Sequence, residues 1–440
     1  MTSLGKGVIN LIENPIKSKI GNGINFTSIY TDKFKSNYLS FYFIRPLDRE
    51  DVTLNALLPM VLSRGNQVNN EFIAIERELE LLYGASYDYD VYKSGEKQII
   101  KFSIEWADSK YINETLVDDK VMEIFFNIIF NPLLNNGCFK EDYVEQEKIN
   151  LQRKISSKIN DKRSYAISRC IEEMCKTERF GIYSLGYVED LGEINSEKLT
   201  NHYKKLISET PFEIIYVGNE KKLDIIKYIP KHITDRQFTI NIPREVIREK
   251  SQYRNHIVER MQVNQGKLVL GLLTGIPYED ELFEALTVGN VILGGSPNSK
   301  LFREVREKYS LAYYANSILF KHKSIIIIDS GVDFRNMQRA LNLTNDQIKK
   351  LKEADFTDNE LNLAKKEIIT SLRAIVDSNH SIASHELDNI LTNKSESIDV
   401  KINKINAVKK EEVVEAFNRV NLDTIYVLTR EGEDDVDVND

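Results

Sequence analysis

The six histidines of this 440-residue chain are the side chains best suited to hold a metal or move a proton. His380 and His385 are followed by Glu386, but a five-residue separation does not place two side chains on one face of a helix. We therefore interpret this group as ordinary histidines with no metal-binding role. The remaining histidines have no recognisable ligand spacing; they are His202, His232, His256 and His322.

Other reactive residue types also fail to form a known catalytic motif. The three cysteines, Cys138, Cys170 and Cys175, make neither a CxxC pair nor an even-numbered disulfide framework, which favours a reducing compartment. The sequence contains no P-loop, no G-x-G-x-x-G fingerprint, no G-x-S-x-G elbow and no Cys–His motif. An independent enzyme of another class has little support, although catalytic triads can be assembled from distant residues.

Composition and charge favour a soluble, cytoplasmic protein. Hydrophobic residues make up 42% and charged residues 29% of the chain, as in ordinary globular proteins. The net charge of −8 argues against nucleic acid or an anionic membrane as the main partner, because both need a concentrated basic surface. The first residues lack the pattern of a signal peptide, and no apolar run reaches the roughly 20 residues that span a bilayer.

The predicted strands and helices occur in the same order twice along the chain, which indicates an internal repeat. Strand-like runs at 38–44 and 267–273 are each followed by a helix, which closes at Gly65 in the first case and Gly295 in the second. Further along each repeat, a long helix begins near Phe139 in the first and near Phe356 in the second. The last strand of each repeat is predicted at 212–218 and at 424–428. The offset between matched features is about 214 to 231 residues, as duplication of one domain would give.

The repeat predicts two homologous α+β domains, each a mainly antiparallel sheet with helices packed on one side. The N-terminal domain is expected at 1–229 and the C-terminal domain at 266–430. Between them, residues 230–265 are polar and broken by prolines, which is typical of a linker. Residues 431–440 are expected to form a solvated acidic tail.

This order of motifs resembles the insulinase/pitrilysin family of zinc peptidases, in the bacterial branch related to mitochondrial processing peptidase. The resemblance covers nearly the whole chain and implies a peptidase half-clamshell fold. Active members carry H-x-x-E-H on the first core helix, ahead of a K/R-G turn that here is Arg64-Gly65. A glutamate on a later helix completes their zinc site, and the corresponding segment here runs from Glu145 to Lys154.

The zinc-binding residues of the family are missing from this chain. Ala56 and Met60 stand at the two histidine positions, and Pro59 stands at the position of the catalytic glutamate. The distant glutamate is replaced by Lys154. Zinc needs imidazole and carboxylate ligands, so these four residues predict a degenerate site without metal or catalytic residues. No histidine precedes His202, so the conclusion does not depend on the alignment register.

The second half resembles the family in the stretch from Gly294 to Tyr314. In relatives, an arginine and a tyrosine seven residues later contact the substrate, and here these are Arg306 and Tyr313. Arginine can donate to substrate carbonyls, and a phenol can stabilise an oxyanion. From residue types alone, a surface salt bridge and an edge-strand aromatic are the simpler explanation; the surrounding motif favours substrate binding.

The resemblance implies a non-catalytic subunit of a heteromeric peptidase. An H-x-x-E-H-bearing partner would carry the zinc, none being expected in this chain, and Arg306 and Tyr313 would help to bind a peptide or protein substrate. The chain alone is expected to be inactive. The alternative is a peptide-binding or scaffold protein without proteolysis, linked to a protein-modification pathway.

Overall fold

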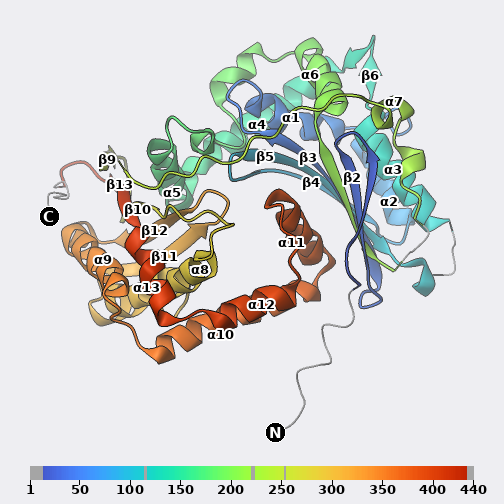
Figure 1. Cartoon of the computed structure of the whole chain (residues 1–440). Coiled ribbons are helices and arrows are strands. Elements are labelled where there is room, and N and C mark those ends of the chain that lie inside the picture. The colour runs from blue at the N-terminus through green and yellow to red at the C-terminus, as the bar shows by residue number, and fades with distance from the viewer. Residues whose placement is uncertain (1–12, 113–115, 220–222, 252–253, 434–440) are drawn as a thin grey trace, which may run out of the picture. The chain divides into compact units, whose positions relative to one another are not determined.

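The computed structural model describes residues 13–112, 116–219, 223–251 and 254–433, which fall into two compact units (Figure 1). The first unit comprises segments within Met1–Ser156, Ser184–Pro243 and Ile375–Leu391, and the second comprises segments within Ser157–Tyr183, Arg244–Ala374 and Thr392–Asp440. Residues 434–440 of the expected acidic tail lie outside the described residues. None of the helices in the described ranges is long and apolar enough to cross a membrane.

The first unit is built on a six-stranded sheet in the order β1-β2-β8-β3-β5-β4. Its strands are β1 (Ile16–Gly21), β2 (Ile24–Tyr30), β3 (Ser36–Pro46), β4 (Ser86–Ser94), β5 (Lys97–Ala107) and β8 (Phe212–Gly218). The β2–β8 pair is parallel and the other pairs are antiparallel. Central strands β3 and β8 are buried along almost their whole length, which explains why both read as apolar runs in the sequence.

Helices pack an apolar core against one face of this sheet. Large buried residues of α1, α3 and α6 join Phe41, Phe43 and Phe212 of the strands in one cluster. The helices of the unit are α1 (Val52–Leu62), α2 (Phe72–Leu81), α3 (Val117–Phe130), α4 (Glu141–Ser157), α6 (Ser196–Glu209), α7 (Lys231–Thr234) and α11 (Asn379–Leu391). A short hairpin, β6 (Leu134–Asn135) and β7 (Cys138–Phe139), precedes α4.

The second unit repeats this topology with five strands, in the order β9-β13-β10-β12-β11. Its strands are β9 (Asn255–Arg260), β10 (Gly266–Leu273), β11 (Ala312–Phe320), β12 (Ile325–Val332) and β13 (Asn421–Thr429). The β9–β13 pair is parallel, as β2–β8 is, and the remaining pairs are antiparallel. Strand for strand, this order matches β2-β8-β3-β5-β4, so the duplication inferred from the sequence is present in the fold.

The helices of the second unit include two π-helical segments, η7 (Val291–Gly295) and η8 (Phe302–Lys308). Its α-helices are α5 (Lys162–Met174), α8 (Phe283–Asn290), α9 (Met337–Lys352), α10 (Asp358–Ala374), α12 (Ile398–Ala407) and α13 (Lys410–Arg419). Residues of α8, α9 and α13 bury one face of the sheet, with Leu268, Leu270 and Leu272 of β10 in the same cluster. The predicted α+β class, with mainly antiparallel sheets and packed helices, is confirmed.

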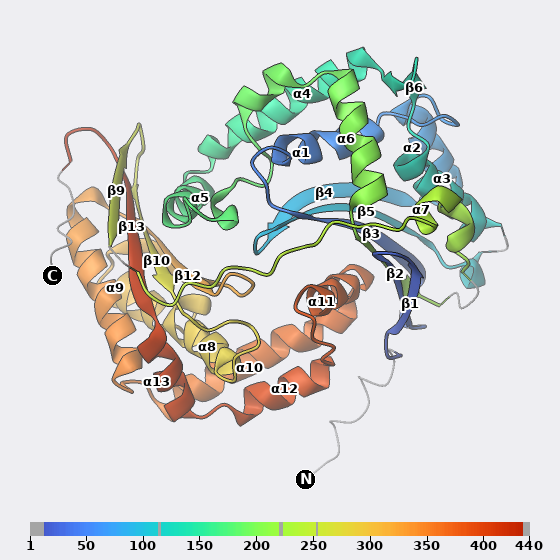
Figure 2. The ribbon, with the colours of Figure 1, turned by 45° about the horizontal axis from the view of Figure 1, so that its top comes forward.

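One helix of each repeat belongs to the other unit. Helix α5 lies between the strands of the first repeat in sequence, yet its buried residues pack on β10 and β13. A Cβ atom added to Gly271 of β10 would lie 2.6 Å from the Met174 sulfur, so a larger residue there would force the Met174 side chain to move. Helix α11 likewise packs Ile382, Ala383 and Leu387 on β3 and β8 (Figure 2). Among the described residues, each sheet therefore has several helices on one face and one exchanged α-helix on the other.

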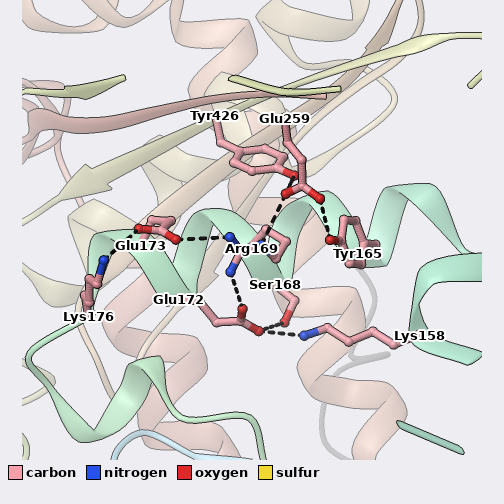
Figure 3. A network of polar contacts seen from close by, with 9 residues as sticks. All are labelled: Lys158, Tyr165, Ser168, Arg169, Glu172, Glu173, Lys176, Glu259 and Tyr426. Atoms are coloured by element: carbon pink, nitrogen blue, oxygen red, sulfur yellow. Dashed lines mark hydrogen bonds and ion pairs between the residues drawn. The ribbon is translucent and has the colours of Figure 1, made fainter. Parts of the chain in front are cut away.

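A polar network fixes α5 to the second sheet (Figure 3). Glu259 of β9 accepts hydrogen bonds from the Tyr165 and Tyr426 hydroxyls and from Arg169 Nε, the last at 3.2 Å. Arg169 also donates to Glu172 at 2.8 Å and to Glu173 at 3.0 Å on its own helix. Because Glu259 of β9 binds both Tyr426 of the neighbouring strand and two residues of α5, the network fixes the orientation of α5 on the sheet.

The two units differ from the contiguous halves that the sequence predicts. Residues 157–183 group with the second unit and residues 375–391 with the first, because each carries a helix whose apolar face covers the other sheet. The segment expected to be a linker, 230–265, contains the short helix α7 and the edge strand β9. Strand β9 is only partly buried, and its mixed polar sequence hides the strand pattern.

Candidate functional site

Helix α1, which carries three of the four positions that the family resemblance assigns to a degenerate zinc site, is buried on all sides. Every residue of Val52–Leu62 is buried, including Ala56 at 2% and Met60 at 5% exposure. Pro59 lies inside the helix, where it cannot donate a backbone hydrogen bond. At Ala56, Pro59 and Met60 the helix therefore provides apolar packing, and these residues supply neither a metal ligand nor a proton acceptor.

The fourth position, Lys154, lies on the exposed side of α4 within a small cluster of cations and aromatic rings. Its Nζ is 6.0 Å from the ring centroid of Tyr89 on β4. Glu147, two helical turns earlier on α4, is buried and forms an ion pair with Arg64 at 3.3 Å. Burial raises the pKa of Tyr89, and the Glu147 carboxylate raises it further. We refer to Arg64, Tyr89, Glu147 and Lys154 as the Arg64 cluster.

The residues of α1 and of the Arg64 cluster do not fit a zinc ion. The cluster supplies one carboxylate, already paired with a guanidinium, and two cations that repel a divalent metal. Throughout the described ranges, no group of three or more His, Cys, Asp or Glu side chains is placed to hold a metal. A structural or catalytic zinc site needs at least three such ligands.

His202, the first histidine in the sequence, is a structural residue of the core beside α1. Its Nε2 lies 2.7 Å from Asn55 Oδ1, and Asn55 donates in turn to Gln98 Oε1 at 2.8 Å. Burial lowers the pKa of His202 to about 4, against the opposing effect of Asp51. The imidazole is therefore neutral at physiological pH and ties α6 to α1.

His380 and His385 both lie on α11, and in the described part of the chain they belong to no group of three or more His, Cys, Asp or Glu side chains placed to hold a metal. The His380 ring meets Tyr38 edge-on, with centroids 5.9 Å apart. Glu386 is buried and pairs with Lys17 of β1 at 2.8 Å. These side chains hold the exchanged helix on the first sheet.

Arg306 and Tyr313 are both exposed in the second unit. Arg306 lies on η8 with its guanidinium carbon 4.4 Å from the Phe302 ring centroid. Tyr313 is 71% exposed and sits in edge strand β11, where the pairing with β12 shifts register between Ala312 and Tyr314. The expected helix before Arg306 is present as a π-helix, and the expected exit into a strand begins at Ala312.

Comparison with known proteins identifies the family. A family model described as "Peptidase M16 inactive domain" matches residues 193–368. A Bacillus subtilis protein named "Probable inactive metalloprotease YmfF" is 30% identical over 416 residues, covering 94% of this chain and 97% of that protein. The chain belongs to the M16 peptidase family. It is an inactive homologue within M16, as the resemblance to insulinase-type peptidases predicted.

Solved structures show the same M16 architecture. A conserved protein from Enterococcus faecalis V583 has a TM-score of 0.88 at 26% identity, over 96% of this chain and all 100% of that one. A structure from Pseudomonas fluorescens, titled as a peptidase M16 inactive domain, has a TM-score of 0.78 at 17% identity, with coverage of 96% and 100%. The second similarity concerns the fold alone.

Sequence reasoning missed the contacts of the Arg64 cluster. Arg64 was visible as part of the turn after the first core helix, and Glu147 as part of the later helix. Nothing in the sequence pairs them, because an ion pair between distant segments depends on tertiary structure. The one available signal was a carboxylate at a position that faces the core, between Val144 and Leu151 on one helical stripe.

Proposed function

We propose that this chain is the non-catalytic subunit of a heteromeric M16 peptidase. A partner subunit with H-x-x-E-H would supply the zinc ligands and the catalytic glutamate, and this chain would supply Arg306 and Tyr313 for substrate binding. The observation that carries the proposal is the 71% exposure of Tyr313. A tyrosine that served only to stabilise an edge strand would bury its ring against a neighbour.

The setting of Arg306 supports the same role. Within the described ranges Arg306 forms no ion pair, and its guanidinium stacks on Phe302. Stacking restricts the side chain and leaves its N–H groups able to donate to a carbonyl or carboxylate. The neighbouring cations on this helix are engaged differently, since Arg303 pairs with Glu360 and Lys308 with Glu304.

The sheets also offer a way to hold a peptide backbone. Strands β4 and β11 occupy equivalent outer positions, and the outer edge of each pairs with no other described strand. An extended peptide can add to such an edge through main-chain hydrogen bonds, with little demand on its sequence. Tyr313 lies on one of these edges, next to the bulge that interrupts its pairing.

The test begins by copurifying the tagged chain from its native cells and identifying the stoichiometric partner by mass spectrometry. We expect a subunit with H-x-x-E-H and, for the pair but neither subunit alone, zinc-dependent cleavage of unstructured peptides. Arg306→Ala and Tyr313→Phe should each lower kcat/KM of the pair at least about tenfold, if each removes one transition-state or substrate hydrogen bond. Lys308→Ala, which removes a nearby exposed cation, is the matched control.

Two results would redirect the proposal. If turnover by the assembled pair were unchanged in Arg306→Ala, its substrate-binding role would be refuted. If the stoichiometric partner lacked any zinc motif, the chain would be a peptide-binding or scaffold protein without proteolysis. A protein-modifying enzyme as that partner would connect it to a modification pathway.

A further inference from the structure

Helix α2 of the first unit leaves half of its six apolar residues exposed to solvent, namely Phe72, Ile73 and Leu81. Of its ten residues, only Ile75 and Leu79 are buried, whereas Ile73 is 58% and Leu81 81% exposed. Val68, in the segment just before the helix, is 61% exposed. Single exposed apolar residues are ordinary, but several on one short helix mark a candidate interaction surface.

Val68 and Leu81 border a groove between α2, α3 and the segment before α2, whereas Ile73 does not line it. The groove has a volume of about 370 Å³ and is lined by Val68, Asn69, Glu78, Leu81, Leu82, Lys120, Glu123, Ile124 and Asn127. Leu82 and Ile124 are buried residues that form apolar parts of its lining. The volume lies within the usual range of ligand pockets, so the groove can accept side chains from a partner.

The charges around the groove are predominantly acidic. Its lining contains Glu78 and Glu123 against the single cation Lys120. Glu78 is fixed in place by a hydrogen bond from Asn69 at 2.8 Å. An apolar groove with a fixed acidic border complements a ligand that is apolar on one side and basic at its margins.

We propose that the α2–α3 groove binds a basic amphipathic helix from a partner protein. Apolar anchors of that helix, spaced i, i+3, i+4 and i+7, would contact Val68, Leu81 and Ile124. Lysine or arginine residues at the margins of its apolar face would meet Glu78 and Glu123. This surface is separate from Arg306 and Tyr313, and the inference does not depend on the proposed peptidase role.

The first measurement is fluorescence anisotropy of the full chain with three labelled peptides of about 18 residues, long enough to form a helix on binding. One is a leucine–lysine peptide in helical amphipathic register, the second is its shuffled isomer, and the third replaces lysine by glutamate. We expect the first to bind at least about tenfold more tightly than either of the others. Equal binding of the shuffled peptide would show only non-specific attraction to an acidic protein and would overturn the proposal.

Variants locate the binding to the groove. Leu81→Ser should weaken the leucine–lysine peptide about tenfold, whereas Val400→Ser, at a residue 44% exposed on α12, should not. Glu123→Lys should weaken binding severalfold at low salt and less at high salt, since the contact is solvent-exposed. Glu353→Lys, the same charge change on an exposed side chain of the second unit, should have no comparable effect.

Both pairs of variants change exposed side chains, so loss of folding does not confound the comparison. If Leu81→Ser and Val400→Ser behaved alike, the groove would not be the site and the proposal would fail. Sedimentation velocity tests a second copy of this chain as the occupant. A self-association abolished by Leu81→Ser would assign the groove to a homodimer and overturn the basic-helix proposal.

Discussion

The guanidinium of Arg64 lies 3.3 Å from the carboxylate of Glu147, and this ion pair joins the segment that follows α1 to helix α4. Arg64 also stacks on Tyr143, with 5.1 Å between its guanidinium carbon and the ring centroid. The segments in which the resemblance predicts the degenerate zinc-site residues are thus linked by a protein cation. An internal salt bridge and apolar packing stabilise this region of the chain.

Removing Arg64 should destabilise the protein measurably. Arg64→Ala leaves the buried Glu147 carboxylate without its cation, which costs about 3–5 kcal/mol for a fully buried pair. Because Arg64 is partly exposed, we expect a loss of about 2 kcal/mol in the free energy of unfolding. Glu147→Gln should cost less, because it removes the buried charge together with the pair. Urea denaturation of both variants and the double mutant gives the coupling energy. Lys176→Ala, in an exposed pair with Glu173 at 3.8 Å, should change stability by at most about 0.5 kcal/mol.

Restoring the two histidines should not restore a metal site. Ala56→His with Met60→His places larger polar groups into a buried helix, and each overpacking change typically costs about 1–3 kcal/mol. Lys154 still supplies a positive charge in place of the third ligand. We expect a lower Tm and no zinc after dialysis, measured by elemental analysis, with Val400→His as an exposed control. One zinc per chain in the double variant would contradict this account.

His202 should make stability fall in mildly acidic solution. Its pKa in the folded state is about 4, below the ordinary value of 6.5, so the unfolded chain binds more protons between these values. The contribution is complete above pH 6.5 and is lost as pH falls toward 4. Stability should drop by about 2 kcal/mol between pH 7.5 and pH 5 from this residue alone.

The check is to compare that pH dependence with His202→Gln, which keeps an amide donor near Asn55. The variant should lose most of the acid sensitivity between pH 7.5 and pH 5. His232→Gln, at an exposed histidine on α7, serves as the control and should retain it. Identical profiles for wild type and His202→Gln would exclude His202 as the source.

Ionisation of Glu213 should make stability fall as the pH rises, which is the opposite of the effect of His202. Burial raises its pKa to about 7, and neighbouring Glu386 adds to the shift, while Asn25 and Lys17 oppose it. The folded chain then binds more protons than the unfolded chain between pH 4.5 and pH 7, so stability falls as pH rises through this window. Glu213→Gln should raise the unfolding free energy by roughly 2–3 kcal/mol at pH 8 and change it little at pH 4.

Chemical denaturation at the two pH values measures this difference. Glu197→Gln, at an exposed position on α6, should leave the pH profile as it is in the wild type. A Glu213→Gln variant that was no more stable than wild type at pH 8 would show that this carboxylate ionises without penalty.

Local patterns were sufficient to predict the central strands and several helices of the fold. The apolar runs at 38–44, 212–218 and 267–273 lie in β3, β8 and β10, because central strands are buried on both faces. The helix closing at Gly295 is present as α8 and η7. Matching these features in order was enough to detect the duplication, since each repeat must bury the same faces.

The sequence did not show which distant segments pack against one another. The amphipathic pattern of α5 shows that Cys170 and Met174 need an apolar partner, but not which sheet provides it. The contact between His202 and Asn55 joins residues 147 positions apart, and no local motif records it. Strand β9 was missed because an edge strand with polar residues resembles a linker.

The exchanged helix α11 also has a consequence for synthesis of the protein on the ribosome. The first sheet is complete once β8 ends at Gly218, but the helix that covers Tyr42, Ile215 and Val217 spans Asn379–Leu391. Until that helix has emerged, the nascent chain presents an uncovered apolar sheet face, which a chaperone can recognise. Native folding of the first unit is therefore a late event of translation, and a truncated chain that ends before α11 should aggregate.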